Sequence, residues 1–227
     1  MTRAESKPGS GLLLVPTALE RERLALVDFG RWKVSLCGMG PVAAAVEVAR
    51  RLSSEPFAAC VLVGLGGSRD LARAPIGSLV VGSLVRNEAV GCGHDHDFVP
   101  LGEMAPAGET VPADALDLAA PDGWQASGAG TRLMEGVAVR EGALGTVAST
   151  SASLDQAGGW ARRHPDVLVE EMEGHAVAVA CLAADVPLSI VRAVSNEAGD
   201  REKSRWDIIG ALSALGRALP ALLGAGP

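Results

Sequence analysis

The feature that most constrains how this 227-residue chain can fold is an alternation of short apolar runs with amphipathic segments. Short apolar runs between turn residues are typical of buried strands, and apolar residues at helical spacing are typical of helices packed on a sheet. Strands separated by helices form a largely parallel sheet that is covered on both faces. We expect strands at residues 11–15, 33–37, 58–64, 142–150, 166–170 and 187–195. We expect helices at residues 17–27, 41–52, 154–164, 174–184 and 203–223.

Local signals refine this pattern. Thr17 is expected to cap the first helix, and Pro41 suits the first turn of the second. Residues 76–90 predict a long strand pair or one bent strand. Residues 93–135 are rich in Pro and Gly, and we expect at most short helices there.

The composition fits one domain with a sizeable core. Hydrophobic residues make up 48% of the chain and the mean hydropathy is +0.24, which is typical of a folded globular protein. We expect a single domain over residues 11–223, with flexible tails at 1–10 and 224–227. Ligands of open α/β sheets bind beyond the carboxyl ends of the strands, so the loops that follow the strands are where a site is expected.

Charge and cysteine usage limit the partners and the location of the protein. The net charge is -7 and no basic face is visible, so we expect small molecules or proteins as partners and no nucleic acid. No apolar run is long enough to cross a bilayer and the N-terminus lacks an apolar signal core, so no membrane partner is expected. The cysteines lack CxxC spacing, which favours reduced thiols in a cytoplasmic protein. They are Cys37, Cys60, Cys92 and Cys181.

Two glycine-rich stretches resemble nucleotide-binding loops but lack their context. Gly38, Gly40 and Ala43 mimic a GxGxxA dinucleotide fingerprint, yet they follow the second expected strand and no acidic residue ends the next one. The stretch GLGGS lacks the lysine of a P-loop. Gly66 and Gly67 within it would still let a ligand approach the backbone, the alternative being a sharp turn.

A histidine–aspartate cluster is the candidate for metal binding. His94 and His96 would share a face if the segment were a strand, with Asp95 or Asp97 assisting. No second paired-ligand motif accompanies them. We therefore favour a solvated loop and expect no metal and no cofactor.

Three polar residues lie near strand ends. Glu22 belongs to the first expected helix, Glu173 begins a later helix, and Asn196 follows the apolar run IVRAV. Each has an ordinary explanation: a solvated helix face for Glu22, a helix N-terminus that favours acidic groups for Glu173, and a turn for Asn196. Their coincidence at strand ends favours a shared site.

The stretches GSLVV, EEMEG and RAVSN, in this order, resemble the purine nucleoside phosphorylase and nucleosidase superfamily. EMEG, at residues 171–174, is similar to the ribose-binding signature of that superfamily. VSNEAGDREKSRWDI further resembles the futalosine hydrolases, nucleosidases of an alternative menaquinone pathway. The resemblance spans residues 12–219 and is weakest over 92–140. The matching positions near the C-terminus are Asn196, Gly199, Arg201, Trp206 and Ile208.

This resemblance implies a three-layer α/β/α sandwich around a twisted mixed sheet, and hydrolysis or phosphorolysis of an N-ribosidic bond. Glu171, Met172 and Glu173 would contact the ribose, with Glu173 accepting from its hydroxyls as positive charge develops on the sugar. Glu22 matches the residue that orients or deprotonates the attacking water.

Asn196 departs from the adenine-specific nucleosidases, which have Asp at this position. A 6-oxopurine presents the acceptors O6 and N7, to which an amide can donate and which a carboxylate would repel. The sequence therefore predicts hydrolysis of a 6-oxopurine nucleoside, and futalosine carries hypoxanthine. Futalosine also has a carboxyphenyl group at its 5′ end, which Arg201 is expected to meet.

Other functions stay open. A methylthioadenosine/adenosylhomocysteine-type nucleosidase would share the fold. A purine nucleoside phosphorylase would need arginines for phosphate, for which Arg69 and Arg23 are candidates, although Glu22 would crowd an anion. A non-catalytic nucleoside-binding relative would keep the pocket without needing Glu22. In each case we expect a homodimer or a higher homo-oligomer.

Overall fold

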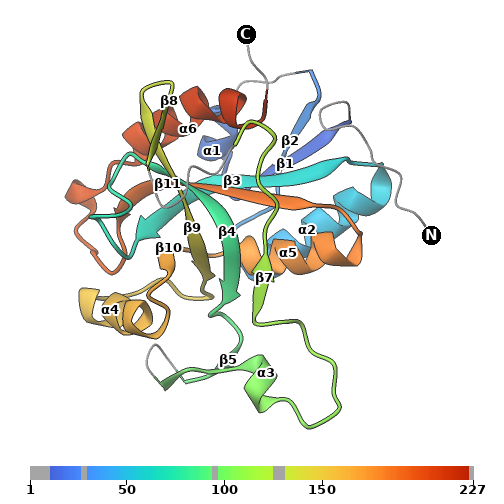
Figure 1. The fold of residues 1–227 in the computed structure, drawn as a ribbon, viewed down its shortest axis with the longest axis vertical. Helices are drawn as coiled ribbons and strands as arrows, with labels where there is room; N and C mark the ends of the chain where they lie inside the picture. Colours follow the sequence, from blue (N-terminus) through green and yellow to red (C-terminus); the bar gives the residue numbers. More distant parts are fainter. Residues whose placement is uncertain (1–10, 27–29, 94–96, 125–130, 225–227) are drawn as a thin grey trace.

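The computed structural model describes residues 11–26, 30–93, 97–124 and 131–224, and its centre is a twisted mixed sheet (Figure 1). The strands are β1 (Leu13–Thr17), β2 (Trp32–Leu36), β3 (Ala59–Ser68), β4 (Leu79–Asn87), β5 (Gly91–Cys92), β6 (Val99–Pro100), β7 (Ala115–Asp117), β8 (Arg132–Met134), β9 (Val137–Thr146), β10 (Val167–Glu171) and β11 (Leu188–Glu197). The helices are α1 (Glu20–Leu24), α2 (Pro41–Ser54), α3 (Leu101–Met104), α4 (Leu154–Arg163), α5 (Gly174–Ala183), the 3-10 helix η2 (Lys203–Arg205) and α6 (Ile208–Leu222).

The main sheet has the strand order β10-β9-β4-β11-β3-β1-β2. β11, β3, β1 and β2 run parallel, β4 is antiparallel to β11, and β9 and β10 follow the direction of β4. The sheet twists so far that β10 also pairs with β3, in the antiparallel sense. The edge strand β10 is therefore brought back beside the middle of the sheet.

Helices cover both faces of this sheet, which gives three layers (Figure 1). α2 and α5 pack together on one face, where Ala44 and Val48 of α2 join the buried residues of α5 in one apolar cluster. α6 packs on the other face through small and aliphatic residues at helical spacing, among them Ala211, Leu215 and Leu219. The predicted α/β/α sandwich around a mixed sheet is confirmed.

One local prediction needs correction. Thr17 does not cap the first helix, because it is the last residue of β1 and α1 begins after Leu19. Of the two alternatives for residues 76–90, the single strand is confirmed: β4 covers Leu79–Asn87, and its pairing with β9 shifts register between Gly82 and Leu84. The other local signals agree with the structure: Pro41 is the first residue of α2, and Gly40 before it has a φ of +88°, which favours glycine.

Two further observations bear on the expectations about membranes and tails. Among the residues described, no helix is both long and apolar enough to pass through a bilayer. The expected N-terminal tail and most of the C-terminal one lie outside the described residues.

Candidate active site

A cavity lies where β1, β3, β10 and β11 end, at the carboxyl edge of the sheet. The last residues of β3, β10 and β11 supply much of its wall, together with the turn after β1, the start of α1 and the loop before α6. The structure brings all of the predicted site residues together in this lining. They are Glu22, Gly66, Gly67, Glu171, Met172, Glu173, Asn196 and Arg201.

Glu22 is buried, with 3% of its surface exposed, so the alternative of a solvated helix face is wrong. One carboxylate oxygen accepts from the backbone N–H of Leu19 at 2.8 Å, which closes the first turn of α1. The other accepts from the backbone N–H of Leu65 on β3 at 3.0 Å. These two bonds fix the carboxylate at the cavity wall.

Gly64 lies next to the side chains of Glu22 and of Arg192, the next functional residue. A Cβ at Gly64 would lie 2.5 Å from Nη1 of Arg192 and 2.9 Å from Oε1 of Glu22. The two side chains therefore converge over a position that only glycine leaves open. Sequence reasoning missed Arg192, whose signal is a lone arginine inside the apolar run SIVRAV.

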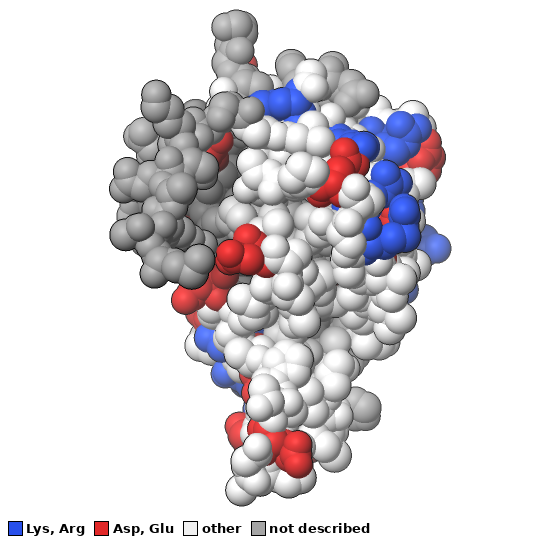
Figure 2. Space-filling model, turned by 90° about the vertical axis from the view of Figure 1, so that its right-hand side faces the viewer, with Lys and Arg blue, Asp and Glu red and all other residues white. Residues whose placement is uncertain are grey.

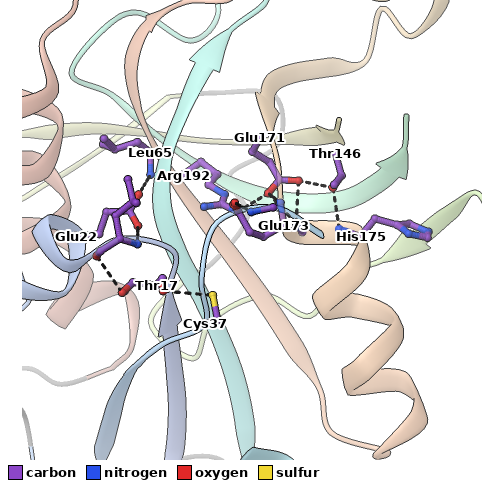
Figure 3. A network of polar contacts seen from close by, with 12 residues as sticks. Thr17, Glu22, Cys37, Leu65, Thr146, Glu171, Glu173, His175 and Arg192 are labelled. Atoms are coloured by element: carbon purple, nitrogen blue, oxygen red, sulfur yellow. Dashed lines mark hydrogen bonds and ion pairs between the residues drawn. The ribbon is translucent and has the colours of Figure 1, made fainter. Parts of the chain in front are cut away.

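Arg192 is fully buried and bridges two carboxylates, as Figure 3 shows. Its Nη2 pairs with Glu171 and, at 3.0 Å, with Oε2 of Glu173. Burial alone would lower the pKa of the guanidinium, but Glu171, Glu173 and Glu22 together raise it above its usual value. Arg192 thus stays charged and pairs with two carboxylates, while the charge of Glu22 nearby adds to the same effect.

Glu171 is engaged by the protein itself. It accepts from the Thr146 hydroxyl, from the Glu173 backbone N–H at 2.9 Å and from the Gly174 backbone N–H at 2.7 Å (Figure 3). It therefore caps the start of α5, the role that helix-dipole reasoning offered for Glu173. With Arg192 as a further partner, both of its oxygens already accept from protein donors.

Glu173 precedes α5 but makes no capping bond with its side chain. One oxygen accepts from the Gly40 backbone N–H at 2.9 Å and the other from Arg192. Burial raises the pKa of Glu173 above its ordinary value, Arg192 opposes this, and the nearby charge of Glu171 adds to it. A desolvated carboxylate at the cavity is well suited to bind hydroxyl groups or a positive charge.

Asn196 has a fixed amide orientation. Its Oδ1 accepts from the Ser195 hydroxyl at 2.8 Å, and its Nδ2 donates to the Glu197 carbonyl at 2.8 Å. A carbonyl can only accept, so the amide nitrogen must face Glu197. One N–H of the amide is left for a ligand in the cavity.

The remaining predicted residues differ in environment. Gly66 and Gly67 lie within β3, so the alternative of a sharp turn is wrong; a Cβ on Gly66 would lie 2.4 Å from Val169 Cγ1. Arg201 is exposed, and its guanidinium lies 5.7 Å from the ring centre of Trp206 at the cavity. Met172 is half-buried in the lining.

A thiol and the expected metal-binding cluster are the other reactive groups to place relative to this cavity. Burial raises the pKa of the nearby Cys37 thiol to about 12, so it stays protonated near neutral pH. No group of three or more potential metal ligands occurs among the residues that the structure describes. His94, Asp95 and His96 lie outside those residues.

Comparison of the chain with known protein families defines the class of protein to which this site belongs. The model of the phosphorylase superfamily matches residues 20–224, and the chain belongs to this superfamily. The superfamily predicted from the EMEG and RAVSN motifs is thereby confirmed.

Curated relatives narrow the class, and all three that match significantly are futalosine hydrolases. The chain is 32% identical to the one from Streptomyces coelicolor, over 81% of this chain and 75% of the relative. It is 35% identical to the one from Thermus thermophilus, over 93% of this chain and 94% of the relative. Among solved structures, an S-adenosylhomocysteine nucleosidase from Streptococcus pyogenes, in complex with 5-methylthiotubericidin, superposes with a TM-score of 0.73 at 22% identity, covering 98% of this chain and 100% of that chain. That likeness shows the fold.

Proposed function

We propose that the protein hydrolyses the N-ribosidic bond of futalosine and releases hypoxanthine. The observation that carries this proposal is the convergence of Glu22, Glu173 and the oriented amide of Asn196 on one cavity. Membership of the family that contains the futalosine hydrolases supports it. The test is the release of hypoxanthine from futalosine in buffer without phosphate.

Glu173 is assigned to the sugar. Breaking an N-ribosidic bond leaves positive charge on the ribose, and a carboxylate that accepts from the ribose hydroxyls is most favourable when that charge is greatest. Gly40 and Arg192 hold both oxygens in place before substrate binds. Met172, the neighbouring residue of the lining, would pack against the sugar.

Glu22 is assigned to the water. Its carboxylate takes a proton as the water oxygen bonds to the ribose, while the electrons of the broken C–N bond go to the departing base. Asn196 donates its remaining N–H to N7 or O6 of that base, which stabilises the charge that develops there. A base held in this way leaves without a metal or cofactor.

Hydrolysis is favoured over phosphorolysis by the charges near the cavity. Arg69, a candidate phosphate ligand, is fully buried and paired with Glu88 and Glu170. Arg23, the other candidate, pairs with Glu20. Glu22, Glu170, Glu171 and Glu173 line the cavity. The buried Arg192 is already paired with two of these carboxylates, so a phosphate dianion would be repelled.

Arg201 is assigned to the acidic 5′ end of futalosine. It is exposed at the cavity beside Trp206, an arrangement that suits an aromatic carboxylate, since the cation meets the carboxylate and the ring can stack. Replacing Arg201 by Ala should raise the KM for futalosine about tenfold and leave the KM for inosine nearly unchanged. Equal KM values for wild type and variant would contradict this assignment.

We also propose that the protein forms a homodimer through the outer face of α2. Val42 and Val46, one helical turn apart, are 76% and 67% exposed, and Met39 before them is exposed and also lines the cavity. Figure 2 looks onto the side where α2 and α5 lie in Figure 1, and uncharged surface fills the middle of that view. An exposed apolar face continuous with a ligand site is typical of an interface between subunits.

A further inference from the structure

We infer that Arg21 is a specificity-determining residue: together with Arg201 it forms a cationic outer end of the cavity and selects nucleosides that carry an anionic 5′ substituent. This inference rests on the proposed function and extends it, since Arg201 alone was assigned to the acidic end of the substrate. Arg21 belongs to α1 and lines the same cavity.

Charge is divided between the buried and the exposed parts of the cavity lining. The acidic side chains of the lining are at most 4% exposed, and they belong to Glu22, Glu170, Glu171 and Glu173. Among the described residues, the lining contains two basic side chains, those of Arg21 and Arg201, and both are exposed. The cavity is therefore acidic at depth and basic where it opens to solvent.

The guanidinium of Arg21 is unpaired in the part of the chain that the structure describes. Its neighbours in α1 are acidic, but both carboxylates have other partners. Glu20 pairs with Arg23, and Glu22 accepts from two backbone N–H groups. The N–H groups of Arg21 are thus available to donate to a ligand.

Arg201 is exposed in the same way but is partly engaged. Its guanidinium lies 5.7 Å from the ring centre of Trp206, and its Nη1 donates to the Thr150 hydroxyl at 3.5 Å. A guanidinium carries five N–H donors in one plane, so most of them remain for an anion. Arg21 and Arg201 come from α1 and from the loop after β11, so two separate elements bring a cation to the opening.

This division of charge matches one class of ligand. Positive charge develops on the ribose as the C–N bond breaks, which the buried carboxylates favour. A substituent that extends toward solvent meets two cations instead, and a carboxylate there can accept from both. Apolar side chains of the lining, among them Leu19, Met39 and Trp206, suit an aromatic ring between ribose and carboxylate. An uncharged substituent would gain little from either arginine.

The test measures the affinity of futalosine and of its carboxamide analogue by calorimetry. The analogue replaces the carboxylate of the 5′ substituent with an uncharged amide of the same shape. All proteins carry Glu22→Gln, so that the ligand stays intact during the measurement. We expect futalosine to bind about 10- to 50-fold more tightly than the amide. Salt at about 1 M should reduce this ratio, since it screens exposed charges beyond about 3 Å.

Arg21→Ala should lower the ratio about three- to fivefold, and Arg21→Lys should keep most of it because the charge is retained. The control is Lys203→Ala, which removes an equal, exposed charge from η2, outside the cavity lining, and should leave the ratio unchanged. An unchanged ratio in Arg21→Ala would overturn the inference. An equal decrease in Lys203→Ala would assign the effect to the overall surface charge, which overturns it too.

Binding and cleavage separate this inference from the proposed reaction. Charge-dependent binding that requires Arg21, without release of hypoxanthine by the wild-type protein, would contradict the reaction and keep the role of Arg21. Cleavage of futalosine with equal affinities for the acid and the amide would do the reverse.

Discussion

The amide of Asn196 has one N–H group left to donate to a ligand, because its neighbours fix the orientation of the amide. The Glu197 carbonyl accepts one N–H and the Ser195 hydroxyl occupies Oδ1. A carboxylate in the same place would face the Glu197 carbonyl with an oxygen. The residue thus links a local hydrogen-bond pattern to the choice of base.

Asn196→Asp should shift the preference from 6-oxopurines toward 6-aminopurines. The carboxylate repels O6 and can accept from an exocyclic amine. We expect kcat/KM for futalosine to fall about 100-fold, as for loss of a specific polar contact in a buried site. Rates with futalosine and with methylthioadenosine give the ratio, and an unchanged ratio would contradict the assigned role.

Glu22→Gln should separate binding from turnover. The Gln carbonyl can still accept from Leu65, but an amide cannot take a proton from water. We expect kcat to fall about 10²- to 10⁴-fold with Kd for substrate changed less than about threefold. Retained turnover would favour a non-catalytic nucleoside-binding protein and remove the role of Glu22.

The acid limb of the pH profile should reflect Glu173. Burial raises the pKa of Glu173 above its ordinary 4.5, and only the ionised form can accept from two ribose hydroxyls. kcat/KM should therefore rise with pH through a midpoint above 4.5. A profile that stays flat down to that value would contradict the raised pKa of Glu173 as the origin of the acid limb.

At the scale of elements, the start of α5 joins the fold to the site. Glu171 caps the helix through the Glu173 and Gly174 N–H groups and also pairs with Arg192 on β11. A helix N-terminus and a buried guanidinium thus depend on one carboxylate. The EMEG motif singled out this carboxylate, but for contact with the ribose rather than for the helix cap.

Glu171→Gln should destabilise the protein, because it leaves a buried guanidinium with one carboxylate fewer. The expected loss is about 3–5 kcal/mol in the free energy of unfolding, as for a broken buried pair. The control is Glu47→Gln on α2, whose pairs with Arg50 and Arg51 are at the surface and whose loss should cost about 0–1 kcal/mol. Urea unfolding measures both, and similar values for the two variants would contradict this account.

Elements were predictable where apolar runs and amphipathic segments alternate. β1, α2, β10 and α5 all fall within a few residues of the expected ranges. The expected helix at 17–27 is shorter in the structure, since α1 ends at Leu24 and residues 27–29 lie outside the described part. The second pairing of β10, with β3, depends on sheet twist and left no local signal.

The residues of the candidate site could be predicted only where a sequence motif or a strand end marks them. Glu22, Glu173 and Asn196 could be found from their places at strand ends. Arg192 and Glu170 could not, because each sits in or beside an apolar run and gains its partners from other strands. Long-range contacts of this kind are set by packing rather than by the local pattern.

At the scale of the whole molecule, the apolar face of α2 should hold two copies together. Val42→Asp with Val46→Asp should give a monomer, since paired charges at the centre of an interface are costly to desolvate. Leu133→Asp on β8, an equally exposed site elsewhere, is the control and should leave assembly unchanged. Sedimentation equilibrium reads the mass. A monomeric wild type, or an unchanged mass in the double variant, would contradict the proposed dimer.

The reaction itself is tested most directly by following free base from futalosine, inosine and methylthioadenosine, each with and without phosphate. The account predicts hypoxanthine from futalosine at a rate that does not depend on phosphate. Adenine released from methylthioadenosine in preference would contradict the role of Asn196. Strict dependence on phosphate would contradict hydrolysis.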